Sequence, residues 1–158
     1  MISKAAKEIR IETPYFLPGH YLRKLLCEAA QRGVNVVIIT PIHSDVHVVD
    51  IIRRHYLGGL HQAGVKLFFY TAGNLHAKGV MIDQDVFSIS SANFDYRSFR
   101  YQYELALIGK EKSLIPQLRE HFDSSLKYCT SFDYQSWKKR STVERIIELM
   151  LLPFRYLF

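Results

Sequence analysis

The sequence predicts an α/β domain in which helices flank a mixed β-sheet. Short apolar segments typical of strands alternate with longer segments whose apolar residues recur at helical spacing. The chain has 158 residues, of which 48% are hydrophobic, so it is long enough to bury a sizeable core. We expect one compact domain over residues 1–135 and an amphipathic, basic C-terminal helix over residues 136–158.

The first strands and the first helix follow in order from the N-terminus. Residues 7–13 and 35–40 are expected to be strands, and the second is almost continuously apolar, which predicts a central strand buried on both faces. Between them, apolar residues recur at helical spacing over residues 22–30, and Gly33 is expected to end that helix. The expected unit is therefore strand, helix, strand.

The remaining elements continue this alternation. A second helix is expected from residue 44 or 45 to residue 63, and a third strand over residues 65–70. After a hairpin over residues 75–90, a last strand is expected over residues 101–108, followed by a helix over residues 112–129.

Composition limits the partners and the compartment. Lys and Arg outnumber Asp and Glu by 21 to 15, and the net charge of +6 favours anionic partners: nucleic acid, anionic lipid headgroups or phosphorylated small molecules. Cys27 and Cys129 fit neither a metal motif nor a disulfide framework, so we expect reduced thiols in the cytoplasm. The N-terminus lacks the apolar core of a signal peptide, and no uncharged apolar run reaches the ~18 residues that span a bilayer.

The expected hairpin carries two chemically active side chains. If residues 75–82 form a strand, His76 and Lys78 project from the same face, because side chains two residues apart in a strand share a face. The polar residues 83–85 are expected to form a tight turn into a second strand over residues 86–90. Both functional groups then face one site.

The register of this hairpin gathers polar groups that suit phosphate chemistry. Counting back from the turn places Lys78 opposite Ser90 and brings Ser91 and Asn93 beside the imidazole and ammonium groups. Lys78, Ser91 and Asn93 offer a cation and neutral donors for the nonbridging oxygens of a pentacoordinate phosphorus. The neutral imidazole of His76 is a competent nucleophile near physiological pH. The sequence therefore predicts a phosphodiester site on the hairpin.

The spacing of these residues resembles the HKD signature of the phospholipase D superfamily. The pattern runs His76-x-Lys78, four residues, Asp83, six residues, and then Ser90-Ser91-x-Asn93. The resemblance implies a phospholipase D-like catalytic domain, catalytic roles for His76, Lys78 and Asp83, and phosphate binding by Lys78, Ser91 and Asn93. Asp83 is expected to orient other groups rather than to act as acid or base, and Glu104 matches an acidic position that often orients the histidine. The family usually has glycine where this chain has Ser90.

The flanking segments resemble the C-terminal half of bacterial cardiolipin synthases of the phospholipase D type. The similar segments are residues 12–18, 30–36 and 92–99. Such enzymes transfer a phosphatidyl group between phosphatidylglycerol molecules and release glycerol, so the resemblance implies a phosphatidyltransferase that works through a phosphohistidine. It implies no cofactor and no metal. The His43-x3-His47 spacing would suit a metal on a helix, but no HExxH glutamate follows.

A single motif supplies only one of the two histidines that this reaction needs. In-line displacement places nucleophile and leaving group on opposite sides of phosphorus, so the general acid must come from a second site. None of the other six histidines is followed by Lys two residues later. We therefore expect a homodimer, or a complementary half that carries a second HKD motif. A homodimeric phosphodiesterase or nuclease and an inactive half-enzyme remnant stay open as alternatives, although no dense basic patch interleaved with aromatics favours nucleic acid.

The C-terminal segment has two possible uses. The basic residues 138–140 precede a capping-box pattern at Ser141 and Glu144, and an apolar stripe follows over residues 143–151. The stripe is expected either to dock on its own domain or, with its basic flank, to bind an anionic membrane surface. With phosphatidylglycerol as substrate, the second use indicates a peripheral protein on the cytoplasmic face of the bacterial inner membrane.

Overall fold

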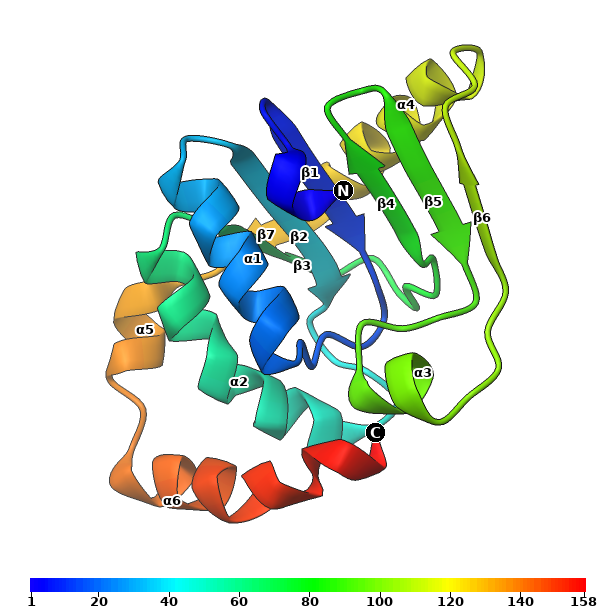
Figure 1. Cartoon of the computed structure of the whole chain (residues 1–158). Coiled ribbons are helices and arrows are strands. Elements are labelled where there is room, and N and C mark those ends of the chain that lie inside the picture. The colour runs from blue at the N-terminus through cyan, green and yellow to red at the C-terminus, as the bar shows by residue number, and fades with distance from the viewer.

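The computed structural model describes residues 1–158 and contains one mixed sheet of seven strands in the order β6-β5-β4-β1-β2-β3-β7 (Figure 1). Strands β1, β2 and β3 are parallel, and the other four join by antiparallel pairing. The predicted α/β class with a mixed sheet is confirmed. The strands are β1 (Glu8–Glu12), β2 (Asn35–Pro41), β3 (Lys66–Tyr70), β4 (Gly79–Ile82), β5 (Val86–Ser90), β6 (Ala106–Gly109) and β7 (Cys129–Ser131).

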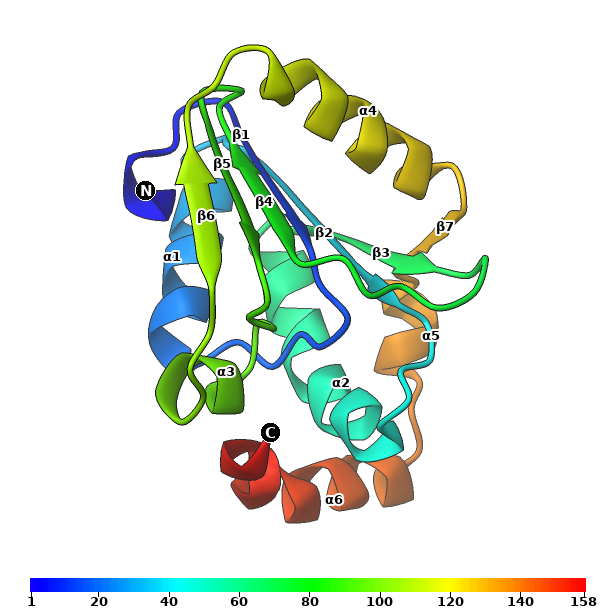
Figure 2. The same ribbon diagram turned by 90° about the vertical axis from the view of Figure 1, so that its right-hand side faces the viewer.

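Helices cover both faces of this sheet. Helices α1 and α2 lie on one face, α4 lies on the other, and α6 lies beyond α2 (Figures 1 and 2). The short helix α3 follows β5 and lies near the C-terminus of the chain (Figure 1). The helices are α1 (His20–Gln31), α2 (His47–Gln62), α3 (Tyr96–Arg100), α4 (Leu114–Leu126), α5 (Tyr134–Lys138) and α6 (Thr142–Leu151), with 3-10 helices η1 (Ile2–Lys4) and η2 (Leu152–Leu157).

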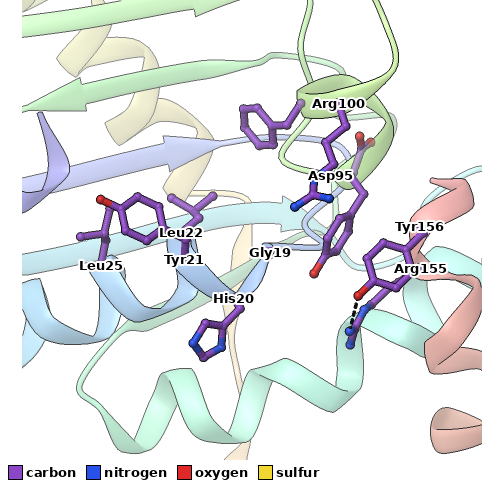
Figure 3. A pocket seen from close by; sticks show the side chains of 11 residues that line it. Gly19, His20, Tyr21, Leu22, Leu25, Asp95, Arg100, Arg155 and Tyr156 are labelled. Carbon is purple, nitrogen blue, oxygen red and sulfur yellow. Dashed lines mark hydrogen bonds between the residues drawn. The ribbon is translucent and has the colours of Figure 1, made fainter.

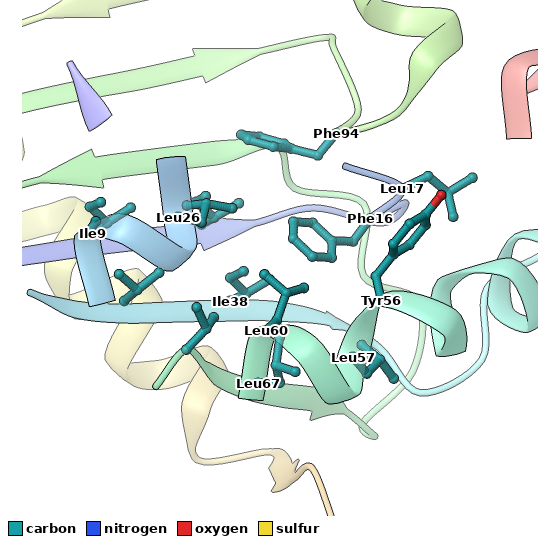
Figure 4. Packing of buried hydrophobic residues seen from close by; sticks show 14 of the residues in the cluster. Ile9, Phe16, Leu17, Leu26, Ile38, Tyr56, Leu57, Leu60, Leu67 and Phe94 are labelled. Atoms are coloured by element: carbon teal, nitrogen blue, oxygen red, sulfur yellow. The ribbon is translucent and has the colours of Figure 1, made fainter. Parts of the chain in front are cut away.

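Two apolar cores lie on the two faces of the sheet. The larger core joins α1 and α2 to β1 and β2, where Ile9, Leu26 and Ile38 are fully buried (Figure 4). The smaller core joins α4 to β2, β4 and β5 around Met81 and Phe122. Strand β2 is therefore buried on both faces, as its apolar sequence predicts.

Charged side chains also hold α4 against β1. Buried Glu8 accepts a hydrogen bond from Arg119 Nη1 at 2.9 Å. Buried Glu12 accepts one from Ser125 Oγ at 3.0 Å, and its other carboxylate oxygen lies 2.8 Å from His121 Nε2. Because a buried carboxylate without a partner is costly, these pairs favour one position of α4 along β1.

The hairpin of β4 and β5 has the predicted register. The pairing of Ile82 with Val86 continues along both strands, and beyond its end the Ser90 N–H donates to the Lys78 carbonyl at 3.0 Å. One part of the prediction is wrong, because β4 begins only at Gly79, and His76 and Lys78 lie in the irregular segment before it. The neighbouring strand β1 ends at Glu12, close to Pro14, which has no N–H with which to continue a ladder.

Asp83 closes the hairpin turn and binds the N-terminal segment. It has a φ of 53°, the left-handed conformation that tight hairpin turns require. Its carboxylate accepts hydrogen bonds from the backbone N–H groups of Ala6, Lys7 and Glu8 at 2.7–2.9 Å. Partial burial acts to raise the pKa of Asp83, but the three N–H donors outweigh it, and the pKa lies below its ordinary value of 3.8.

Replacing Asp83 by Asn is expected to destabilise the chain at neutral pH by about 1 kcal/mol, since the site is partly exposed and only some of the three hydrogen bonds survive. The lowered pKa gives the sign of the pH dependence: the carboxylate stabilises the fold fully above pH 3.8, and this contribution disappears as pH falls through the folded-state value. The free energy of unfolding of the unmodified chain and of Asp83→Asn is measured with urea at several pH values from 7 to 2.5. A stability difference that stays constant across this range would contradict the assigned role.

The last predicted strand is too long, and the single helix expected over residues 136–158 is divided into the end of α5, helix α6 and the 3-10 helix η2. Helix α3 and strand β7 were not predicted. Strand β6 starts at Ala106 because the preceding residues form the loop that leaves α3. Helices α3 and α5 begin after Asp95 and Asp133, whose carboxylates accept N–H groups of the first turn. The predicted helix over residues 112–129 ends at Leu126, and the chain then forms β7, which pairs with β3 and is the edge strand on that side of the sheet.

Helix α6 does not dock through its apolar stripe. The predicted capping box over residues 141–144 is present, but the one buried residue of the helix is Glu148, which pairs with Arg140 at 2.9 Å. In the stripe, Met150 is 68% exposed, and only Leu151 packs against the core. The expectation that the stripe docks on its own domain is therefore wrong for most of its length. None of the helices combines the length and the apolar character that a membrane span needs.

Candidate functional site

The candidate site lies where the hairpin leaves the sheet. The carbonyl of Lys78 accepts the Ser90 N–H just before β4 begins and just as β5 ends, so the two motif segments leave the sheet side by side (Figure 1). Because of this hydrogen bond, Lys78 lies next to the segment that follows β5, as the sequence predicts.

Lys78 is half-buried and lies among carboxylates. Its Nζ donates to the His76 carbonyl at 3.0 Å, which folds the ammonium back over the histidine segment. Burial lowers the pKa of Lys78 below its ordinary value, and the nearby carboxylates of Glu104, Asp45 and Asp95 partly oppose that shift. The ammonium is therefore a partly desolvated cation, which attracts a phosphate more strongly than a fully hydrated one does.

Ser91 and Glu104 form a direct pair beside this cation. The Ser91 hydroxyl donates a short hydrogen bond to Glu104 Oε2 and accepts the Leu105 N–H at 3.0 Å. These bonds link the end of β5 to the loop that enters β6. The structure therefore brings the predicted serine and glutamate together, with Glu104 bonded to the serine rather than to the histidine.

Asn93 is held by a neighbour that the sequence analysis missed. Its backbone N–H donates to Ser98 Oγ at 3.1 Å, and the Ser98 N–H donates to Asp95 Oδ1 at 2.7 Å. The Asn93 amide oxygen is buried and accepts no hydrogen bond, so this side chain has capacity for a ligand. Burial raises the pKa of Asp95, and its hydrogen bonds with Ser98 only partly offset that effect. The Asp95-x-x-Ser98 spacing is typical of a helix N-cap and could have predicted from the sequence that Ser98 lies beside this segment.

Two motif residues stand apart from this cluster. The His76 side chain is exposed, and its imidazole makes no hydrogen bond to the other candidates. Asp83 lies in the turn at the opposite end of β4, a strand that rises about 3.3 Å per residue. The structure therefore does not bring Asp83 to the phosphate-binding candidates, and its contacts are with the backbone of residues 6–8.

The two histidines with metal-like spacing do not share a helix. His47 is the first residue of α2, whereas His43 precedes the helix in the loop after β2. The helical geometry that an i, i+4 metal pair needs is therefore absent at these positions.

Replacing Ser90 by Gly is expected to raise turnover several-fold, because removal of the Cβ lets a phosphate approach the backbone between Lys78 and Ser91 more closely. The Ser90 hydroxyl donates only a long bond, 3.4 Å, to the Ala92 carbonyl. Steady-state kinetics on phosphatidylglycerol, the substrate that the resemblance implies, checks the result. Ser90→Ala is the control: it removes the hydroxyl but keeps the Cβ, and an equal gain in this variant would reject the steric explanation.

Comparison with known proteins gives a consistent result. A family model described as "Cardiolipin synthase, PLD-like domain" matches residues 1–126. A cardiolipin synthase of Clostridium perfringens strain SM101 is 35% identical over 151 residues, which cover 96% of this chain and 32% of the relative. Cardiolipin synthase 1 of Bacillus cereus is 34% identical over 148 residues, 94% of this chain and 29% of the relative. The chain thus spans about a third of the length of these relatives.

Solved structures share the fold at low sequence identity. Nuc of Salmonella typhimurium, a phospholipase D family member, has a TM-score of 0.70 at 20% identity and aligns over 83% of this chain and 85% of its own. Phosphatidylserine synthase of Haemophilus influenzae has a TM-score of 0.74 at 15% identity over 98% of this chain and 40% of its own. These likenesses confirm the predicted fold.

Proposed function

Because the chain belongs to the phospholipase D-like family described as the cardiolipin synthase PLD-like domain, we propose that it forms one half of a phosphatidyltransferase of the cardiolipin synthase type. The observation that carries the proposal is that Lys78, Ser91 and Glu104 lie close together where β4 begins and β5 ends, with the unpaired amide oxygen of Asn93 in the segment that follows β5. The proposed substrate is phosphatidylglycerol, an anion that the net charge of +6 favours. No cofactor enters this scheme.

The proposed transfer consists of two displacements at phosphorus. In the first, a ring nitrogen of His76 forms a P–N bond, the P–O bond to glycerol breaks, and the histidine of the partner half protonates the leaving alkoxide. In the second, that histidine takes a proton from a hydroxyl of another phosphatidylglycerol, whose oxygen attacks phosphorus and breaks the P–N bond. Cardiolipin leaves, and both histidines return to their starting state. The two histidines exchange these roles if the partner attacks first.

The other site residues have assigned roles in this scheme. Lys78 and Asn93 bind the nonbridging oxygens, on which negative charge builds up as the fifth bond to phosphorus forms. Ser91, held by Glu104, donates to the same oxygens once substrate displaces the carboxylate from its hydroxyl. Glu104 then orients the imidazole of His76. Asp83 acts on the fold, through the N–H groups that it binds, rather than on the substrate.

The partner half docks along the edge strand β6 in this proposal. An apolar patch, which we call the β6 patch, is exposed there: Ile89 is 45% exposed, Leu105 82%, Leu107 60% and Ile108 56%. An unpaired edge strand with apolar side chains offers hydrogen-bonding groups and apolar area to a second sheet. Since Leu105 follows Glu104 directly, a partner on this patch comes close to the phosphate site. The partner is a second copy of the chain or a complementary half with its own HKD motif.

Product analysis tests the function directly. The purified chain is incubated in chelator with phosphatidylglycerol vesicles and, separately, with DNA, and its mass in solution is measured by light scattering. Cardiolipin and glycerol from a dimeric chain support the proposal. DNA cleavage without cardiolipin replaces it with the nuclease alternative. A monomer that is inactive on both substrates contradicts the homodimer and leaves the complementary half or the inactive remnant.

Helix α6 supports a peripheral place on an anionic membrane surface. Its apolar stripe faces solvent, and basic side chains flank it at Lys138, Lys139 and Arg145. Apolar side chains that enter the headgroup region gain the free energy of burial, while nearby cations are attracted to anionic lipid. We assign the stripe to the cytoplasmic face of the bacterial inner membrane, where phosphatidylglycerol is then both surface and substrate. The exposed members of the stripe are Val143, Ile146, Ile147 and Met150, which are 42–68% exposed.

The double substitution Ile146→Glu and Met150→Glu is expected to weaken binding to phosphatidylglycerol vesicles at least about tenfold, because it removes apolar contact and adds two negative charges. Cosedimentation measures the bound fraction. The matched control, Gln117→Glu with Ser124→Glu, adds the same charge at exposed positions of α4 and is expected to bind almost as the unmodified chain does. If both variants lose the same amount of vesicle binding, the added negative charge alone explains the loss, and the apolar stripe has no role in binding.

A further inference from the structure

A cavity of about 590 Å³ lies between the start of α1, helix α3 and the C-terminal helix η2 (Figure 3). This volume falls within the range of about 300–1,000 Å³ that small-molecule sites occupy. None of His76, Lys78, Ser91 and Asn93 lines it. The cavity is therefore separate from the candidate catalytic site, although α3 begins only three residues after Asn93.

Two arginines in this cavity lack a carboxylate partner. Arg155 donates to the hydroxyls of Tyr156 at 2.8 Å and Tyr56 at 3.4 Å, and Arg100 lies over the Tyr96 ring at 5.8 Å. Neither guanidinium takes part in a salt bridge, in contrast to the buried Arg10 and Arg53 elsewhere in the chain. Two unpaired guanidinium groups in one concave site attract an anion, and phosphate matches their forked donor geometry.

The acidic group of the cavity does not cancel this charge. Asp95 is the one carboxylate in the lining, and it accepts the Ser98 N–H at 2.7 Å as the cap of α3. Figure 3 shows its carboxylate directed toward α3, whereas Arg100 reaches toward the space in front of α1. The first turn of α1, which no side chain caps, opens onto the same space and adds the partial positive charge of a helix N-terminus. The cavity is thus cationic at this end.

Apolar side chains form the rest of the wall. Six of the eleven lining residues are hydrophobic, including Leu22, Leu25 and Phe99. A free phosphate ion would use only the arginines and leave these side chains in contact with water. A ligand that joins a phosphate to a hydrocarbon chain uses both parts of the site, because burial of its methylene groups adds to the charge-assisted hydrogen bonds.

We propose that this cavity binds one molecule of an acidic phospholipid, with its phosphate between Arg100 and Arg155 and an acyl chain along Leu22, Leu25 and Phe99. The lipid bound here does not react, since no motif residue reaches it. Binding requires neither His76 nor the partner half, so the proposal stands apart from the transfer reaction. Because Arg155 lies just after α6, the occupied cavity also anchors the C-terminal segment that carries the stripe.

The test uses the full chain with His76→Ala, so that no turnover consumes the ligand and loss of catalysis is not mistaken for loss of binding. Dihexanoylphosphatidylglycerol, kept below its micelle concentration, is titrated while amide signals are followed by NMR. Its deacylated counterpart glycerophosphoglycerol and the zwitterionic dihexanoylphosphatidylcholine are titrated in parallel. We expect shifts centred on Gly19 to Leu25 and Arg100, and an affinity for the acidic lipid about tenfold above that for either comparison ligand.

Arg100→Gln is expected to weaken binding of the acidic lipid about tenfold, since one charge-assisted phosphate contact is lost. Arg97→Gln is the matched control: it removes the same charge from an exposed position of α3 outside the cavity and should change the affinity less than about twofold. Arg155→Gln provides a second variant, and a melting curve confirms that each is folded. Unchanged binding in folded Arg100→Gln, or equal affinity for glycerophosphoglycerol, overturns the proposal.

Discussion

Replacing His76 by Asn is expected to lower the rate of phosphatidyl transfer at least about 10³-fold, whichever of its two roles the histidine takes. In the proposed reaction the imidazole either forms the P–N bond as nucleophile or protonates the leaving alkoxide as general acid, and the asparagine variant can perform neither step. Because the side chain is exposed and makes no hydrogen bond to the rest of the site, the substitution should leave the free energy of unfolding nearly unchanged. Cardiolipin formation from labelled phosphatidylglycerol, with the melting temperature, measures both quantities.

His43→Asn is the matched control for this experiment, since it makes the same change in an exposed loop before α2. It should keep the unmodified rate within about twofold. After the reaction with labelled phosphatidylglycerol is quenched, a phosphohistidine is identified by acid-labile label on the unmodified chain. The same label should be absent from the His76→Asn variant. Retention of more than about a tenth of the rate by His76→Asn would contradict both roles, because either loss alone exceeds that factor.

The hairpin could be predicted from sequence because its determinants are local. A polar turn between two apolar segments defines the pairing, and the period of two along a strand then fixes which residues face each other. The same reasoning failed at the start of β4, where the limit of the strand is set by a distant neighbour. The pairing of β1 with β4 ends at Glu12 and Gly79, close to Pro14, and nothing in the sequence of residues 75–82 indicates where that pairing stops.

The position of Asp83 also depends on distant groups. Its spacing from His76 places it in the motif, but the N–H groups that it binds belong to residues 6–8, more than seventy positions away in the sequence. The motif therefore predicted a role for the Asp83 carboxylate, but it did not predict which groups the carboxylate contacts. Helix α6 gives a second example: amphipathic periodicity predicts an apolar face, but it does not distinguish a face that meets the core from one that meets solvent.

Replacing Arg53 by Met is expected to destabilise the chain by about 3–5 kcal/mol, the largest effect on stability that we foresee. The buried guanidinium pairs with Asp50 at 3.1 Å and donates to Thr40 Oγ1 and to the carbonyls of Pro41 and Ile42 at 2.8–3.1 Å. Burial lowers the pKa of Arg53 to about 10, with Asp50 opposing the shift, so the group stays protonated at neutral pH. Its loss leaves the buried Asp50 carboxylate without its cation and with the Ser44 N–H, at 2.8 Å, as its remaining donor, and it removes a donor from three further acceptors.

Thermal unfolding measures this effect, and the expected loss corresponds to a fall in melting temperature of roughly 10 °C for a chain of this size. Arg54→Met is the matched control at the next position. Its side chain is half-exposed and pairs with Glu144 only at 3.6 Å, so removal of this charge should cost less than about 1 kcal/mol. The double substitution Asp50→Asn and Arg53→Met should recover part of the loss, because it also removes the stranded charge. If the double variant is no more stable than Arg53→Met, the lost hydrogen bonds at the end of β2, rather than the buried charge, account for the effect.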